Sequence, residues 1–247
     1  MSRSVSKFRF KHFSVSHHRS SMKIGVDGVL IGAWTYIGSS RRILDVGTGC
    51  GVIALMMAQR APEAEIDAID IDAASIEEAS ENISVSPWSG RIRAILGSYS
   101  DALSLLSVED SGYDLIVSNP PYFDSGVTQA VTSREKARHQ GELCPLSLLR
   151  GARSLLRQNG SVAMVVPSEY SDDLEKEAEK MEFVLERKCL VRGHDKAPFK
   201  RSLLQWRLLG SDSDKTFPEL KFLTLETTPG IPTDDYRDLC KDFYLRF

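Results

Sequence analysis

The chain has 247 residues, which is enough for one large α/β domain with a short appendage. Hydrophobic residues make up 42% of the chain and charged residues 26%, as is usual for a globular protein. No window approaches the ~18 uninterrupted apolar residues that a membrane span needs, and the first residues lack the apolar stretch of a signal peptide. We therefore expect a cytoplasmic protein with no membrane partner.

The basic residues are clustered although the net charge is only −3. Residues 1–26 hold six lysines and arginines, three histidines and no acid, and a second basic stretch covers residues 187–207. A nearly neutral chain can therefore present a positive face to a phosphate backbone, although basic termini also serve simply to keep a protein in solution. The four cysteines are far apart and show no metal-ligand spacing, so we expect free thiols and no metal site.

Apolar runs alternate with amphipathic stretches from residue 42 to about residue 209. Predicted strands cover 42–46, 65–69, 92–96, 113–117, 160–166, 183–191 and 202–209. Predicted helices cover 52–60, 73–85 and 146–156, and a further helix has Ser171 as its N-cap with Asp172 and Asp173 in its first turn. This alternation predicts an α/β fold with a seven-stranded, mostly parallel sheet and helices on both faces. Residues 1–41 would form a basic segment and helix packed on the site, 42–210 the core, and 211–247 a C-terminal strand–helix extension.

A glycine-rich turn follows the first strand of this core, with the sequence Asp45-Val46-Gly47-Thr48-Gly49-Cys50-Gly51. Its spacing differs from the dinucleotide fingerprint of an NAD-binding Rossmann domain, and an acid before it suits a cationic amino group better than a pyrophosphate. The second strand ends at Asp70, and a carboxylate there accepts hydrogen bonds from ribose hydroxyls. A ligand that has an amino acid at one end and a ribose at the other is S-adenosylmethionine, so these residues predict a site for that cofactor.

This arrangement resembles the class I methyltransferases, which have a Rossmann-like fold. The resemblance implies that Asp45, Gly47, Thr48, Gly49 and Gly51 line the methionine part of the cofactor. It also implies that Asp70 and Ile71 contact the ribose side, and that Ser98 and Tyr99 lie near the adenine. Many relatives carry an acid at the position of Ser98.

The fourth strand is followed by Asn119-Pro120-Pro121-Tyr122. Two prolines fix the backbone and remove two N–H donors, so the Asn119 side-chain oxygen and the Pro120 carbonyl remain as acceptors. Two acceptors that grip the hydrogens of a planar amino group aim its lone pair at a methyl donor, while Tyr122 offers a ring for stacking. The motif resembles that of amino-group methyltransferases, which implies that Asn119 also borders the cofactor.

The resemblance extends over nearly the whole chain to the tRNA1(Val) adenine-N6 methyltransferases. It rests on residues 10–34, on Ser86-Pro87-Trp88, on residues 126–138 and on Phe243-Tyr244-Leu245. It implies transfer of a methyl group to the adenine 3′ of the anticodon in a valine tRNA, with Lys23 at the cofactor pocket and a monomeric enzyme. His18 stands where the family pattern has an acid. The candidate RNA-binding residues are Arg9, Lys11, Arg19, Arg138, Lys196, Lys200 and Arg201.

Other functions remain open at this point. A methyltransferase of protein glutamine would usually carry a separate helical domain before the glycine turn, and only 44 residues precede Asp45. A DNA adenine methyltransferase would need a target-recognition domain, and transfer to guanine N2 of rRNA is a further alternative. A non-catalytic RNA-binding module with this fold would have no need for the sequence at residues 119–122.

Overall fold

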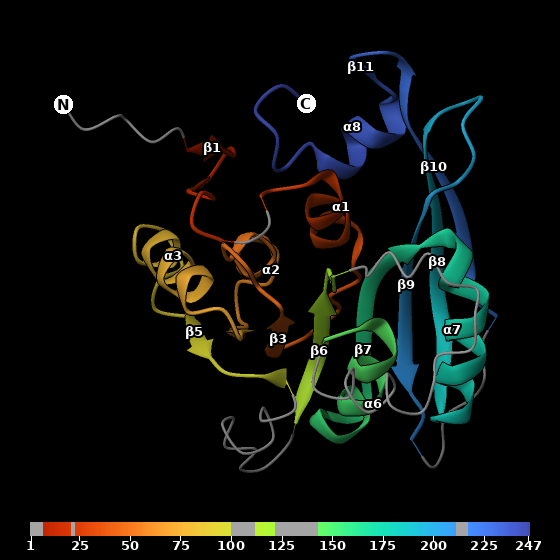
Figure 1. Ribbon diagram of the computed structural model, residues 1–247, viewed down its shortest axis with the longest axis horizontal. Coiled ribbons are helices and arrows are strands. Elements are labelled where there is room, and N and C mark those ends of the chain that lie inside the picture. The colour runs from red at the N-terminus through yellow and green to blue at the C-terminus, as the bar shows by residue number, and fades with distance from the viewer. Residues whose placement is uncertain (1–6, 21–22, 100–111, 122–142, 211–216) are drawn as a thin grey trace.

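The computed structural model describes residues 7–20, 23–99, 112–121, 143–210 and 217–247 (Figure 1). The strands are β1 (Phe8–Arg9), β2 (Ser14–Val15), β3 (Arg42–Val46), β4 (Glu65–Asp70), β5 (Ile92–Leu96), β6 (Tyr113–Ser118), β7 (Leu156–Pro167), β8 (Phe183–His194), β9 (Arg201–Leu208), β10 (Glu219–Thr228) and β11 (Ile231–Pro232). The helices are α1 (Val26–Trp34), α2 (Val52–Arg60), α3 (Ala73–Ser84), α6 (Pro145–Leu155), α7 (Ser168–Lys180) and α8 (Asp234–Cys240).

The main sheet has the strand order β11-β10-β8-β9-β7-β6-β3-β4-β5. The seven predicted core strands are contiguous in it, which confirms the predicted α/β fold. Strands β5, β4, β3, β6 and β7 run parallel, and only β9 runs against both of its neighbours. The C-terminal segment extends the sheet, because β10 pairs in parallel with β8 and β11 turns back along β10.

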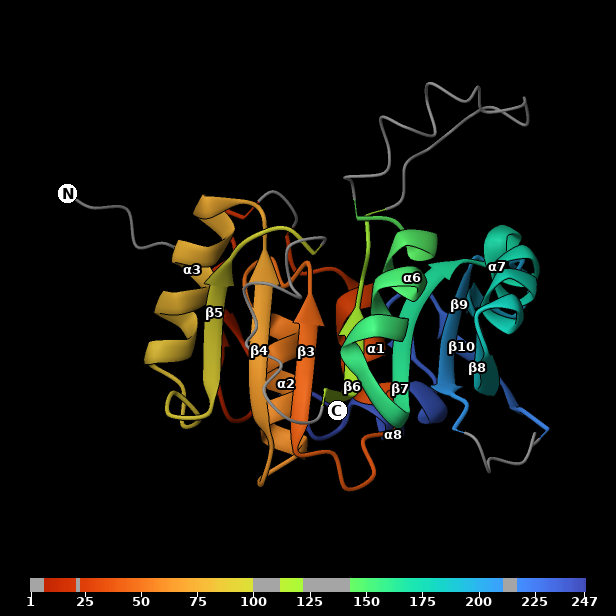
Figure 2. The same cartoon turned by 90° about the horizontal axis from the view of Figure 1, so that it is seen from below.

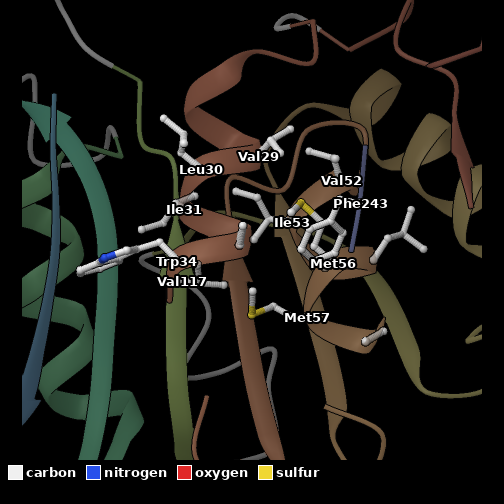
Figure 3. Packing of buried hydrophobic residues seen from close by; sticks show 14 of the residues in the cluster. Val29, Leu30, Ile31, Trp34, Val52, Ile53, Met56, Met57, Val117 and Phe243 are labelled. Atoms are coloured by element: carbon white, nitrogen blue, oxygen red, sulfur yellow. The ribbon is translucent and has the colours of Figure 1, made fainter. Parts of the chain in front are cut away.

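Helices cover both faces of the sheet, as Figure 2 shows, and each face has its own hydrophobic core. One core joins the sheet to α1, α2, α3 and α8, and the other joins it to α6 and α7. Figure 3 shows the first core, in which Ile31 of α1 lies near Val117 of β6, and Met56 of α2 lies near Phe243. Every residue of β6 is buried, which explains why the central strands read as continuous apolar runs.

Helix α7 begins four residues earlier than predicted. Pro167 at the end of β7 takes the N-cap position, so the helix starts at Ser168. Ser171 is therefore a buried residue inside the helix, and its hydroxyl bonds to the Glu175 carboxylate at 2.9 Å. The prediction of Ser171 as the N-cap was wrong because a proline with a fixed φ already turns the chain into the helix.

Candidate active site at the carboxyl edge of the sheet

The glycine turn and the Asn-Pro-Pro segment leave the sheet side by side. Val46 at the end of β3 pairs in register with Ser118 at the end of β6, and the Ser118 hydroxyl donates to the Val46 carbonyl at 2.7 Å. In Figure 2 the arrowheads of β3, β4 and β5 point to the same edge of the sheet. The strand order reverses between β3 and β6, and such reversals are where open α/β sheets bind ligands.

The glycine turn adopts a backbone that only glycine tolerates well. Gly47, Gly49 and Gly51 have φ of 68°, 54° and 84°. A Cβ atom on Gly47 would lie 2.8 Å from the Leu143 side chain. The turn is also fixed to the neighbouring strand, because the N–H groups of Gly47 and Thr48 donate to the Ile69 carbonyl at 2.9 and 3.1 Å. The conformation of the turn is thus fixed by contacts with its own sheet at the carboxyl edge.

Asp45 is a fully buried carboxylate at the base of this turn. Its Oδ2 atom accepts hydrogen bonds from the Thr48 hydroxyl at 2.6 Å and from the Ala54 N–H at 3.0 Å. Its Oδ1 atom is buried and has no hydrogen-bond partner within the described residues. Burial raises the pKa of Asp45 from 3.8 to about 7, and the two hydrogen bonds only partly oppose this. A cationic amino group would supply the missing donor and keep the carboxylate ionised, so this site fits the methionine end of S-adenosylmethionine.

Asp70 ends β4 beside the glycine turn. Its Oδ2 atom accepts the Gly49 N–H at 2.8 Å and its Oδ1 atom accepts the Asp72 N–H at 3.0 Å. Asp72 in turn caps α3 by accepting the N–H groups of its first turn. These contacts orient the Asp70 carboxylate and leave it acceptor capacity for the two hydroxyls of a ribose. Ile71, next to Asp70, is 67% exposed and offers an apolar surface on the same side.

Ser98 and Tyr99 follow β5, and the Tyr99 side chain contacts α6. The Tyr99 hydroxyl donates to the Leu148 carbonyl at 3.0 Å, and its ring packs so closely on α6 that a Cβ atom on Gly151 would lie 2.5 Å from it. The Tyr99 side chain is therefore engaged with α6, and the position of Ser98 and Tyr99 near an adenine stays a prediction. Ser98 is half-buried.

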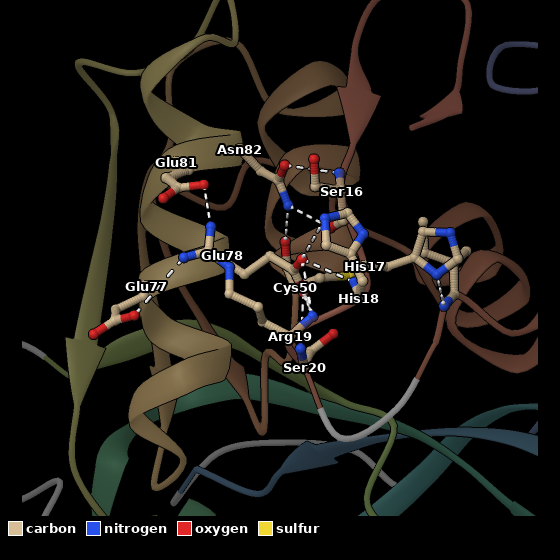
Figure 4. A network of polar contacts seen from close by, with 11 residues as sticks. Ser16, His17, His18, Arg19, Ser20, Cys50, Glu77, Glu78, Glu81 and Asn82 are labelled. Carbon is tan, nitrogen blue, oxygen red and sulfur yellow. Dashed lines mark hydrogen bonds and ion pairs between the residues drawn. The ribbon is translucent and has the colours of Figure 1, made fainter. Parts of the chain in front are cut away.

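A buried acid that the sequence analysis missed holds the N-terminal segment on α3 (Figure 4). The Glu78 carboxylate accepts N–H groups from His18 at 2.8 Å, from Arg19 at 3.2 Å and from Ser20 at 2.9 Å. Burial alone would raise the pKa of Glu78, but these backbone donors together outweigh it, so the pKa is lowered. His18 itself is an exposed side chain with its Nε2 atom 3.7 Å from Glu78.

One turn further along α3, Asn82 joins the same segment to the glycine turn. Its side-chain oxygen accepts the Ser16 N–H at 2.8 Å, while its Nδ2 atom donates to the carbonyls of Ser16 and Cys50, both at 2.9 Å. We call Glu78 and Asn82 together the α3 clamp. The i, i+4 spacing could have marked both side chains as one face of a helix, but no sequence signal indicated their partners.

At the reacting end, Asn119 is half-buried, Pro120 is buried and Pro121 is exposed. Tyr122 lies outside the described residues. Lys23 is an exposed residue just before α1.

The candidate RNA-binding residues fall into two groups. Arg9, Lys196 and Lys200 are exposed, and no ion pair of their side chains is found in the described part of the chain. Three others have internal partners: Lys11 donates to the carbonyls of Lys241 and Phe247, Arg19 pairs with Glu77 and Glu81, and Arg201 pairs with Asp27. Arg138 lies outside the described residues.

Two further features concern metals and membranes. The described residues contain no group of three or more histidine, cysteine or acidic side chains placed to hold a metal ion. All four cysteines are free thiols, as predicted. Among the described helices, none combines the length and the apolar character that crossing a bilayer requires.

Comparison with known proteins identifies the class. The methyltransferase small domain family matches residues 29–190. A predicted O-methyltransferase from Agrobacterium tumefaciens has a similar structure, with a TM-score of 0.65 and 16% identity over 88% of this chain and 96% of that one. A methyltransferase from Pyrococcus furiosus has a TM-score of 0.58 with 18% identity over 80% of this chain and 90% of that one. The fold and the matched family define a class I methyltransferase that uses S-adenosylmethionine.

The sequence relatives narrow this class to one family. The tRNA1(Val) (adenine(37)-N6)-methyltransferase of Bacteroides fragilis is 40% identical over 97% of this chain and 98% of its own length. The protein of that name from Trichodesmium erythraeum is 38% identical over 98% of each chain. The chain belongs to the family of tRNA1(Val) (adenine(37)-N6)-methyltransferases.

Proposed function

We propose that this protein transfers a methyl group from S-adenosylmethionine to N6 of the adenine just 3′ of the anticodon in a valine tRNA. The observation that carries the proposal is the pairing of Val46 with Ser118, because it brings the glycine turn and Asn119 to the same point of the sheet edge. The names and the near full-length coverage of the relatives support this choice of substrate.

The cofactor would be held at its two ends. Asp45 would accept its ammonium group at Oδ1, and Asp70 would accept its ribose hydroxyls. The positive φ values of Gly47 and Gly49 let the backbone approach it closely. When bound, the cofactor supplies an electrophilic methyl group on a sulfonium sulfur.

Asn119 and Pro120 would position the target nitrogen. An exocyclic amino group is a weak nucleophile because its lone pair is delocalised into the ring. The Asn119 side-chain oxygen and the Pro120 carbonyl would each accept one of its hydrogens, which favours a pyramidal nitrogen whose lone pair points at the methyl group. The same two oxygens would stabilise the positive charge that develops on the nitrogen during transfer.

The adenine must leave the stack of its loop to reach Asn119. Exposed basic side chains such as Arg9, Lys196 and Lys200 would supply phosphate contacts and make binding dependent on salt. The roles of the site residues, the division of the chain at residues 42 and 210, a monomeric state and a cytoplasmic location stay predictions.

The direct test uses purified protein, labelled S-adenosylmethionine and total tRNA from a strain that lacks the enzyme, followed by mass spectrometry of nucleosides. We expect N6-methyladenosine in a valine tRNA. Label in guanosine or in protein would overturn the choice of substrate and leave the class of enzyme intact.

A further inference from the structure

Three segments meet at the carboxyl edge on the far side of Asn119 from the glycine turn. They are the start of α1, the start of α7, and the residues at the start of β9. The Ser168 N–H donates to the Lys200 carbonyl at 3.1 Å, and the hydroxyls of Ser168 and Ser202 lie 3.2 Å apart. Arg201 binds Asp27 of α1 at 2.8 Å. We call these joined segments the rim.

The rim stands next to the proposed target site. Strand β7 is the neighbour of β6, with Met164 in register with Ser118, and Pro167 in register with Arg201 on β9. At about 3.3 Å per residue, the three positions from Met164 to Pro167 raise the rim by roughly 10 Å beyond the level of Ser118. Strands are about 4.8 Å apart, so the rim lies one to two strand spacings to the side of Asn119.

Two side chains of the rim suit an unstacked nucleotide. Tyr170, in the first turn of α7, is 40% exposed, whereas Ser171 next to it is buried. The Lys200 side chain is exposed and forms no ion pair among the described residues, while hydrogen bonds hold its backbone to α7 and to Val191. An exposed aromatic ring and a lysine, here on two segments that a backbone hydrogen bond joins, are the combination with which proteins bind single-stranded nucleic acid.

Two acids close to Tyr170 in the sequence pair with lysines other than Lys200, so they do not neutralise the Lys200 ammonium. Asp172 lies 3.2 Å from the Lys188 ammonium, and Asp173 lies 2.9 Å from the Lys176 ammonium. The exposed Glu169 is the acid left beside Tyr170, so a phosphate would approach from the side of Lys200.

We propose that Tyr170 and Lys200 bind a nucleotide that flanks the target adenine, with its base stacked on the Tyr170 ring and its phosphate at the Lys200 ammonium. The proposal rests on the proposed function, since it takes the partner to be an RNA whose adenine is turned out at Asn119. Turning out that base exposes the face of its neighbour, and the Tyr170 ring replaces part of the lost stacking.

The test is a binding measurement that needs no catalysis. An RNA hairpin with the valine anticodon loop is titrated by fluorescence anisotropy with the wild type, Tyr170→Ala and Tyr170→Phe. We expect Tyr170→Ala to weaken binding by about 5-fold to 100-fold, and Tyr170→Phe to keep the wild-type affinity because stacking needs the ring and no hydroxyl. The affinity for S-adenosylmethionine should be unchanged in both variants.

Tyr36→Ala is the matched control, since Tyr36 is 63% exposed and follows the C-terminal end of α1, away from the carboxyl edge. It should bind the hairpin as the wild type does. Wild-type affinity of Tyr170→Ala would overturn the proposal, and so would an equal loss in Tyr36→Ala or a parallel loss of cofactor affinity.

A second pair of variants tests the phosphate contact. Lys200→Ala should lower the slope of log affinity against log salt by roughly 0.7, the value for one phosphate of a single strand. Lys180→Ala, at the opposite end of α7, should leave the slope unchanged. An unchanged slope for Lys200→Ala would remove the phosphate contact from the proposal.

Methylation of the same hairpin by the wild type separates the two proposals. If the wild type methylates the adenine while Tyr170→Ala binds normally, only the inference about the rim fails. If the wild type neither binds nor methylates this RNA, both fail. If it binds the hairpin through Tyr170 but transfers no methyl group to adenine, the rim binds RNA and the proposed function fails.

Discussion

The two sides of the carboxyl edge differ in how their polar side chains are held. On the side proposed to bind the cofactor, Asp45 and Glu78 are fully buried, and backbone N–H groups or a hydroxyl hold their carboxylates in place. On the rim, the side chains of Tyr170 and Lys200 are exposed, and within the described part of the chain hydrogen bonds hold the backbone that carries Lys200 but not its side chain. A small charged ligand is bound well by groups that are fixed and desolvated beforehand, whereas a polyanion is attracted by exposed cations and stacks on exposed rings.

The strongest test of this difference is Asn119→Ala, at the border between the two sides. Losing one of the two acceptors should reduce the rate of methyl transfer by roughly 10²-fold to 10³-fold, because the lone pair of the amino group no longer points at the methyl group. Single-turnover transfer and calorimetric binding of S-adenosylmethionine would be measured together. We expect cofactor affinity to change little, and a variant that lost only cofactor affinity would show that the assigned roles are wrong.

Glu78→Ala should lower the free energy of unfolding, because Glu78 holds residues 18–20 on α3. Removing the carboxylate leaves the buried N–H of Ser20 and the part-buried N–H groups of His18 and Arg19 without their acceptor, at a cost of about 3 kcal/mol in the free energy of unfolding. Since the pKa of Glu78 is lowered, its contribution to stability is present at neutral pH and is lost as the pH falls below 4.5, the ordinary value for a glutamate, and through the lowered pKa. Urea denaturation at pH 7 measures the loss.

Glu77→Ala is the control for that variant, because Glu77 is an exposed acid of the same helix that pairs with Arg19 at 3.8 Å. It should change the free energy of unfolding by no more than about 0.5 kcal/mol. Equal effects of the two variants would contradict the structural role of the α3 clamp.

Asp70→Ala should weaken cofactor binding by roughly 1.5–3 kcal/mol, the value of hydrogen bonds to a charged acceptor. Transfer at saturating S-adenosylmethionine should recover most of the wild-type rate. The measurement is the KM for the cofactor against kcat. A loss confined to kcat would place Asp70 outside the cofactor site.

Asp45→Asn should change how stability depends on pH. The pKa of Asp45 is raised to about 7, so the folded state binds its proton more tightly than the unfolded state does. The wild type therefore loses stability as the pH rises from about 4 to about 7, and between pH 5 and pH 8 this amounts to roughly 2 kcal/mol. Denaturation of the cofactor-free variant should lack this loss, and an identical pH profile in both proteins would contradict it.

Sequence reasoning predicted the features that depend on local pattern. A pattern of a few consecutive residues is enough to indicate each apolar strand of the core, the glycine turn and the neighbouring Asn-Pro-Pro segment. Parallel strands bring their carboxyl ends to one edge, which is why residues as distant as Gly47 and Asn119 could be placed together.

The features that were missed depend on contacts between distant segments. Glu78 binds residues 58 to 60 positions away, and Asn82 binds Ser16 from 66 positions away. Arg201 pairs with Asp27, which lies 174 positions earlier in the chain. Sequence reasoning could not see this internal partner when it proposed Arg201 as an RNA-binding residue. The start of α7 was misplaced for a local reason, since Pro167 and Ser171 both favour a helix start and the proline comes first.

The contact between the two ends of the described chain has a consequence for folding during synthesis. The Lys11 side chain bonds to carbonyls 230 and 236 positions later, and Phe10 bridges to Tyr244. The segment that continues from there to the α3 clamp precedes every strand of the main sheet in the sequence, whereas residues 241–247 follow every one of them. The contacts that hold this segment beside the glycine turn therefore cannot all form until the residues after the last strand have been synthesised.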